Sequence, residues 1–125
     1  MKTAAALAGV RAPIYSQALT PAEDPPSVYF SELTRLECRV GPVRKEDPDL
    51  LAKFDAFFAI RGVERIPWDR EVFDLATQIR AKHGTKTPDA LHLAAAVVGQ
   101  CDEFWTNDHR LNAAARGRIE IRVVG

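Results

Sequence analysis

The sequence lacks an excess of either charge, because its 125 residues include 17 Lys and Arg against 17 Asp and Glu. Non-specific binding to nucleic acid depends on many phosphate contacts, so this balance argues against a protein held to RNA or DNA by bulk charge. A site that uses only a few local basic groups remains compatible with the composition.

Cysteine is also scarce, and long apolar runs are absent. The two cysteines, Cys38 and Cys101, are too few for a disulfide framework, and each lies among apolar residues. We expect both to be reduced core thiols. The Ala-rich start is short and is followed by Arg11 and Pro13, which is not typical of a signal peptide. No run approaches the roughly 18 apolar residues of a membrane span, so we expect a cytoplasmic protein without membrane contact.

The remaining composition is that of one globular domain. Apolar residues make up 46% and charged residues 27% of the chain, both ordinary values for globular proteins. A length of 125 residues fits a single domain over 1–125. Residues 1–26 are atypical, because an Ala-rich stretch with weak helical character leads into a Pro-rich loop at 21–26.

Short apolar strands alternate with helical patterns along the rest of the chain. We expect strands at residues 28–30, 63–67, 104–106 and 119–124. Helices are expected from Ser31 to Gly41-Pro42, from Pro48 to Gly62, from Asp69 to about Gly84, and from Thr87 to Gly99, with Ser31, Asp69 and Thr87 as N-caps that precede the first helical residue. This alternation predicts an α/β fold with a mostly parallel sheet. Ligands bind such sheets beyond the carboxyl ends of the strands.

Three segments combine acids with other polar residues near those ends. They are Ser-Glu-Leu-Thr-Arg-Leu-Glu at 31–37, Thr-Pro-Asp-Ala-Leu-His-Leu-Ala-Ala-Ala at 87–96, and Thr-Asn-Asp at 106–108. In this order, and with a Gly-Pro after the first, they resemble the PIN-domain family and VapC toxins in particular. Each motif alone is modest, but the three together are specific. The resemblance covers residues 27–125.

The resemblance implies a three-layer α/β/α sandwich. It implies an endoribonuclease that depends on Mg²⁺ or Mn²⁺ and that acts as the toxin of a toxin–antitoxin pair. The implied partners are an RNA substrate, a cognate VapB-type antitoxin and a second copy of the chain in a homodimer.

Carried over residue by residue, the resemblance makes Glu37, Asp89 and Asp108 the catalytic, metal-holding acids. The chemistry is consistent, because hard divalent cations take oxygen ligands and activate water at a phosphate. Three converging carboxylates repel one another without a metal, which should raise the pKa of at least one.

Other residues would support this centre. Ser31, Thr106 and Asn107 are candidate hydrogen-bond partners of the acids. The candidates for contact with RNA are Arg35, Arg39, His109 and Arg110.

The chain departs from the family pattern at its start. The family begins with a central strand that ends in Asp, some thirty residues before the position of Glu37. Here the first acids are Glu23 and Asp24, which lie too close to Glu37. We therefore expect the first strand to be missing or replaced and residues 1–20 to fold mainly as helix. We would expect such a pattern from a truncated gene or a misassigned start, and an inactive module that binds antitoxin or RNA is the alternative function.

Simpler interpretations exist for the same residues. An acid such as Asp89 is favoured in a first helical turn by the helix dipole. Asp108 could be a turn residue, and Glu37 a solvated helix residue. His92 is expected to be a hydrogen-bonded core histidine rather than a ligand. If all the acids are caps and surface charge, the chain is a metal-independent interaction domain.

Overall fold

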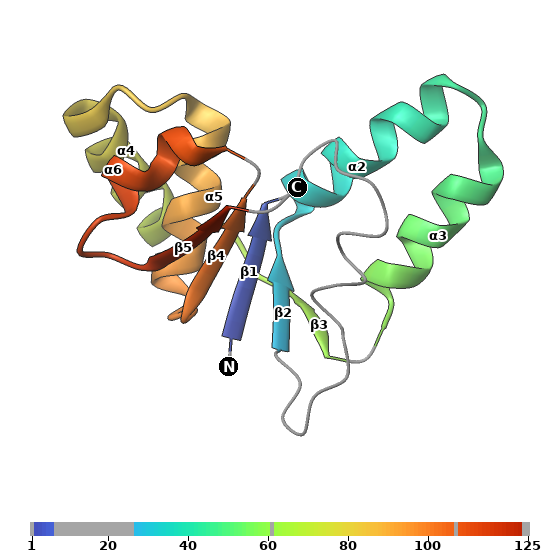
Figure 1. Ribbon diagram of the computed structural model, residues 1–125, viewed down its shortest axis with the longest axis horizontal. Helices are drawn as coiled ribbons and strands as arrows, with labels where there is room; N and C mark the ends of the chain where they lie inside the picture. The colour runs from blue at the N-terminus through green and yellow to red at the C-terminus, as the bar shows by residue number, and fades with distance from the viewer. Residues whose placement is uncertain (1, 7–26, 61, 107, 124–125) are drawn as a thin grey trace.

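The computed structural model describes residues 2–6, 27–60, 62–106 and 108–123 (Figure 1). Within them, five strands form one sheet in the order β3-β2-β1-β4-β5, and every pairing is parallel. The strands are β1 (Lys2–Ala6), β2 (Ser27–Phe30), β3 (Val63–Arg65), β4 (Glu103–Thr106) and β5 (Glu120–Val123). The predicted mostly parallel sheet is therefore confirmed.

The central strand β1 corrects the sequence-based expectation for the start of the chain. We expected no first strand and mainly helix over residues 1–20, but Lys2–Ala6 pairs with β2 on one side and β4 on the other. A gap between β2 and β4 would leave backbone groups of both strands unpaired, and this outweighs the helix propensity of alanine. Residues 7–26, with Glu23 and Asp24, lie outside the described residues.

The helices cover both faces of the sheet, so the three-layer α/β/α arrangement is confirmed. Figure 1 shows α2 and α3 on one side and α4, α5 and α6 on the other. The helices are α2 (Glu32–Arg44), α3 (Pro48–Phe58), α4 (Arg70–His83), α5 (Thr87–Val98) and α6 (Asn112–Ala115), with a 3₁₀ turn η1 (His109–Leu111) before α6.

Each face of the sheet has its own apolar core, as the two-residue alternation of strand side chains requires. Phe30 and Trp105 pack with the phenylalanines of α3, whereas Phe104 packs with α4 and α5. Cys38 and Cys101 are both buried, as predicted, and neither takes part in a disulfide within the described part of the chain.

Helix α5 is deeply buried among the described residues, because its sequence from 90 to 98 is apolar nearly all round. Every residue from 90 to 96 is buried, and the helix contacts both β1 and β4. No helix among the described residues is long and apolar enough to cross a membrane.

Most predicted helix ends agree with the structure. Ser31 caps α2 by accepting a hydrogen bond from the Thr34 N–H, and Asp69 caps α4 by accepting one from the Val72 N–H. Gly84 ends α4 in the left-handed region at φ 66°, a conformation that glycine adopts without steric cost.

Three predicted boundaries were wrong. Helix α2 continues through Pro42 to Arg44, since the proline is buried near the end of the helix and removes only one backbone hydrogen bond there. Helix α3 ends at Phe58, four residues before Gly62. Helix α5 begins one residue earlier than expected, with Lys86 as its N-cap and Thr87 already helical.

Candidate functional site

The three candidate acids come from three elements that meet at one edge of the sheet. Asp108 follows the carboxyl end of β4, Glu37 lies on the helix that follows β2, and Asp89 lies in the first turn of α5. In a parallel sheet the strand ends lie at the same edge, where ligands bind. The topology thus delivers the acids to the region that the sequence predicted.

Asp89 and Asp108 line a common pocket of about 200 Å³. The pocket lies where the end of α4 meets the start of α5, and the cationic side chains Lys86 and Arg110 also line it. It therefore combines two carboxylates with two positive charges in a small volume.

The surroundings of the Asp89 carboxyl group disfavour its charged form. Its pKa is raised above the ordinary value because burial disfavours the charged form and because Asp108 and, more weakly, Glu37 repel it. His92 and Arg110 act in the opposite direction. The expectation that at least one of the three acids has a raised pKa is confirmed, and a cation would relieve this repulsion.

Asp108 is held in a tight turn after β4. Its backbone N–H donates to the Thr106 Oγ1 at 3.1 Å, and its Oδ1 accepts the backbone N–H of Arg110 at 2.9 Å. Thr106 is buried, and the contact is with the backbone of Asp108, not with the carboxylate that the sequence suggested as its partner. Of the two other predicted supports, Asn107 lies outside the described residues, and the Ser31 hydroxyl contacts His92 and the Thr34 N–H instead of an acid.

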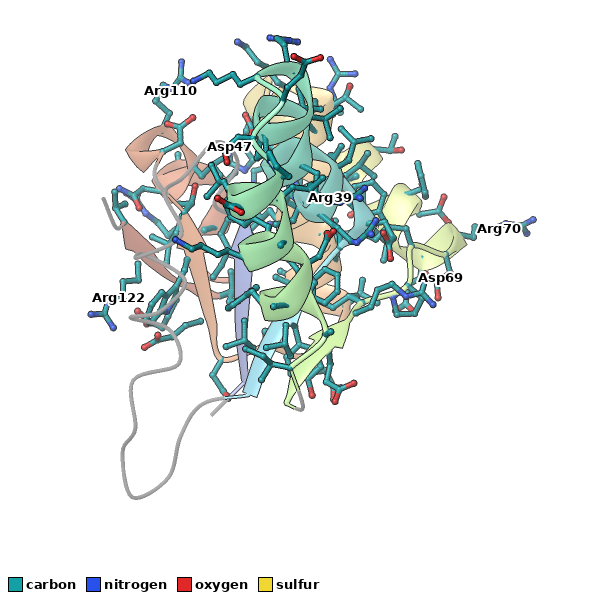
Figure 2. All side chains as sticks on the ribbon, turned by 90° about the vertical axis from the view of Figure 1, so that its right-hand side faces the viewer. Arg39, Asp47, Asp69, Arg70, Arg110 and Arg122 are labelled. Carbon is teal, nitrogen blue, oxygen red and sulfur yellow. The ribbon has the colours of Figure 1, made fainter. Side chains whose placement is uncertain are left out.

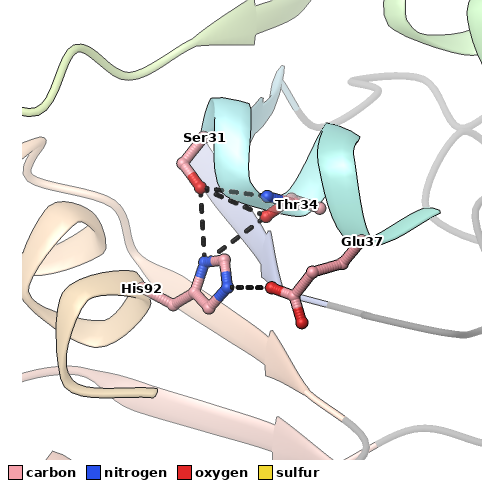
Figure 3. Close-up of polar contacts among 4 residues, drawn as sticks. All are labelled: Ser31, Thr34, Glu37 and His92. Atoms are coloured by element: carbon pink, nitrogen blue, oxygen red, sulfur yellow. Dashed lines mark hydrogen bonds and ion pairs between the residues drawn. The ribbon is translucent and has the colours of Figure 1, made fainter. Parts of the chain in front are cut away.

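Glu37 is bound to a histidine that the sequence had assigned only to the core (Figure 3). Its Oε1 lies 2.9 Å from His92 Nε2. On the other side of the ring, His92 Nδ1 lies 3.3 Å from Ser31 Oγ and 3.4 Å from Thr34 Oγ1. His92 is therefore buried and hydrogen-bonded, as expected, and it also joins the start of α2 to one of the candidate acids.

The acidic side chains meet part of the requirements of a divalent cation. Among the described residues, no three or more Asp, Glu, His or Cys side chains are close enough to form a complete metal site. However, Mg²⁺ commonly binds through one or two carboxylates and keeps several waters. The two carboxylates of the shared pocket fit this mode. Glu37 is a third acid in the neighbourhood, since its charge contributes to the raised pKa of Asp89.

Comparison with known proteins identifies the family. The model of the PIN domain family matches residues 3–117. The chain belongs to the PIN-domain family. The match begins within β1, earlier than the residues 27–125 that the motifs predicted. None of the curated proteins matches the chain.

Solved structures show the same fold. The crystal structure of VapBC2 from Rickettsia felis bound to a promoter DNA fragment is similar with a TM-score of 0.71 at 14% identity, and covers 98% of both chains. A toxin–antitoxin complex from Klebsiella pneumoniae is similar with a TM-score of 0.62 at 16% identity, over 98% of this chain and 97% of that chain.

The candidate RNA-binding residues of this PIN domain are not gathered into one patch. Arg39 forms an ion pair with Asp55 on α3 at 2.8 Å, and Arg35 lies 3.8 Å from Glu32. Figure 2 shows Arg39 and Arg110 far apart. The side chain of His109 lies outside the described residues. Of the candidate side chains that the structure describes, only Arg110 adjoins the acidic pocket.

Sequence reasoning missed two participants, Thr34 and Lys86. Thr34 is three residues after Ser31, one helical turn along α2, and this spacing could have indicated that both hydroxyls face the same neighbour. The spacing of Asp89 and His92, again one turn, places both on the same side of α5. Lys86 precedes the motif directly and carried no signal of its own.

Proposed function

We propose that this PIN domain is a metal-dependent endoribonuclease and the toxin of a VapBC-type toxin–antitoxin pair. The observation that carries the proposal is the common pocket of Asp89 and Asp108, in which burial and mutual repulsion raise the pKa of Asp89. Carboxylates with a shifted pKa that share a pocket with other charged groups are typical of functional sites.

Asp89 and Asp108 would hold Mg²⁺ or Mn²⁺, and Glu37 would complete the acidic centre. The bound cation would supply an activated water and neutralise charge at the scissile phosphate. Thr106 would keep Asp108 in place through the hydrogen bond to its backbone. Lys86 and Arg110, at the pocket wall, are placed to bind phosphate oxygens of RNA.

The proposed partners follow from the family and from the fold neighbours. Both similar structures are described as toxin–antitoxin assemblies, which supports a VapB-type antitoxin as the partner of this chain. A homodimer and a cytoplasmic location are part of the same proposal.

Calorimetric titration with Mn²⁺ tests the metal site directly. We expect micromolar binding by the wild-type protein and none by Asp89→Asn. Asp74→Asn is the matched control, because Asp74 is an exposed acid on the neighbouring helix α4. Cleavage of a mixed RNA pool should follow the same order and stop when EDTA is added. No Mn²⁺ binding by the wild type would refute the proposal.

An inactive PIN module that binds antitoxin or RNA without cleavage is the second candidate. Two observations favour it. The central strand Lys2–Ala6 contains no acid, and Arg110 already binds the carboxylate of Asp108. This candidate predicts that the purified chain forms a complex with its antitoxin but cleaves no RNA at any Mn²⁺ concentration.

A further inference from the structure

We propose that His92 is a positioning residue that fixes the Glu37 carboxylate for its role in the metal centre. This inference rests on the proposed function, since it gives a buried histidine a task only if Glu37 belongs to the site. It assigns to the site a residue that the sequence placed in the core.

Both ring nitrogens of His92 have partners, and together they define the orientation of the ring. An ionised carboxylate can only accept, so the 2.9 Å contact requires that Nε2–H donates to Glu37 Oε1. In the neutral ring Nδ1 then accepts from a hydroxyl, and both Ser31 and Thr34 are within reach. The Ser31 hydroxyl can donate because its lone pair already accepts the Thr34 N–H at 3.3 Å.

The side chains of His92, Ser31 and Thr34 that hold Glu37 are buried, whereas Glu37 itself is partly in solvent. Exposure is 7% for His92, 4% for Ser31 and 1% for Thr34. The imidazole also packs against Trp68 in a T-shaped arrangement, with ring centroids 5.9 Å apart. The side chain of Glu37 is 30% exposed. A glutamate in that setting would sample several rotamers, and the contact with His92 removes this freedom in advance.

Only one carboxylate oxygen of Glu37 takes part in the hydrogen bond with His92. Figure 3 shows Oε2 turned away from the imidazole while Oε1 points to it. Hydrogen bonds from neighbouring groups orient carboxylates in metal sites in this way, and their loss typically weakens metal binding by 10–100-fold. His92 therefore acts on the centre through Glu37 and does not need to touch the cation.

A purely structural role is the competing interpretation, because His92 also links α5 to α2. Two substitutions distinguish the contribution of Nε2 from that of Nδ1. In His92→Gln the side-chain amide reaches as far as Nε2 and can still donate to Glu37. In His92→Asn the shorter amide reaches only as far as Nδ1, so it keeps the hydroxyl partners and loses Glu37.

The test measures Mn²⁺ affinity by calorimetry for both variants, for Glu37→Gln, and for the Glu37→Gln/His92→Asn double variant. We expect His92→Asn to bind Mn²⁺ roughly tenfold more weakly than the wild type, and His92→Gln within about threefold of it. In the Glu37→Gln background, His92→Asn should cause no further loss, because the residue acts only through Glu37. A structural role would instead give additive losses.

Folding is checked by thermal melting of each variant. If His92→Asn does not fold, Thr34→Val replaces it in the same cycle, since it removes one hydroxyl partner of the ring at nearly constant volume and should weaken Mn²⁺ binding in the wild-type background alone. Wild-type affinity in the asparagine variant, or additive losses, would overturn this inference and leave the metal site standing. Absence of Mn²⁺ binding in the wild type would overturn the proposed function and the positioning role together.

Discussion

Arg110 holds Asp108 by both carboxylate oxygens. Its Nε lies 2.9 Å from Oδ1 and its Nη2 lies 2.8 Å from Oδ2, in the two-pronged geometry that suits a guanidinium and a carboxylate. The pKa of Arg110 is raised by this hydrogen bond and by the charge of Asp108. The arginine thus occupies the same oxygens that a cation in the pocket would need.

Replacement of Arg110 should therefore strengthen metal binding. We expect Arg110→Ala to raise the affinity for Mn²⁺ by a factor of up to about five. The Arg110–Asp108 ion pair must be broken before Asp108 can bind the cation, and the gain is small because an exposed ion pair contributes little free energy. The difference in Mn²⁺ affinity between Arg110→Ala and the wild type should be smaller at high salt, because salt already weakens the Arg110–Asp108 ion pair in the wild type. Calorimetric titrations at two salt concentrations measure both effects.

Arg116→Ala is the matched control, since Arg116 is an exposed arginine beyond the end of α6. It should leave Mn²⁺ affinity unchanged. If Arg110 also contacts phosphate, Arg110→Ala should weaken RNA binding in EDTA, opposite to its effect on the metal. A loss of Mn²⁺ affinity in Arg110→Ala would show that the arginine supports the site and does not compete with the cation.

Asp89→Asn should stabilise the metal-free protein while it abolishes the metal site. Asp89 has a raised pKa in the folded state, so between its ordinary and its raised pKa the folded protein binds more protons than the unfolded chain. Stability contributed by this group falls as pH rises through that window and stays lost above it. At pH 7 in EDTA we expect a gain of up to about 1 kcal/mol for Asp89→Asn.

Urea denaturation at pH 7 and near pH 4 measures this difference. The gain should be smaller near pH 4, where the wild-type carboxyl group is partly protonated. Asp74→Asn, which changes an exposed acid, should show no such pH dependence. A lower stability of Asp89→Asn at pH 7 would mean that the benefit of an acid at the start of α5 exceeds the repulsion.

Gly84 should not tolerate alanine without a loss of stability. It has φ 66°, where a Cβ is strained, so Gly84→Ala should lower the free energy of unfolding by about 1 kcal/mol. Urea denaturation measures this change, and an unchanged free energy of unfolding would contradict the left-handed conformation at the end of α4.

The sequence predicted best where one local pattern decided the structure. The strand at 28–30, the caps Ser31 and Asp69, and the burial of α5 each follow from a few neighbouring residues. The strand Lys2–Ala6 did not, because its alanines favour a helix and only the gap between β2 and β4 makes them a strand. The contact of His92 with Glu37 joins residues 55 positions apart, and no local pattern encodes such a distance.

The position of β1 allows the acid that the family pattern expects to be restored. Ala6 ends the strand, and its backbone is in register with Thr106, two residues before Asp108. An acid at Ala6 would therefore enter the same edge of the sheet as the candidate centre. We expect Ala6→Asp to raise Mn²⁺ affinity about tenfold or more, because it adds a carboxylate ligand to a site that has few of them.

Ala6→Asn is the control, because it matches aspartate in size and lacks its charge. Both variants should lose some stability in the metal-free state, but only Ala6→Asp should regain it when Mn²⁺ is added, since a ligand that binds the folded state alone stabilises it. RNA cleavage should rise with the aspartate and not with the asparagine. Equal Mn²⁺ affinity in the two variants would show that the end of β1 does not face the centre, and would favour the inactive module over the nuclease.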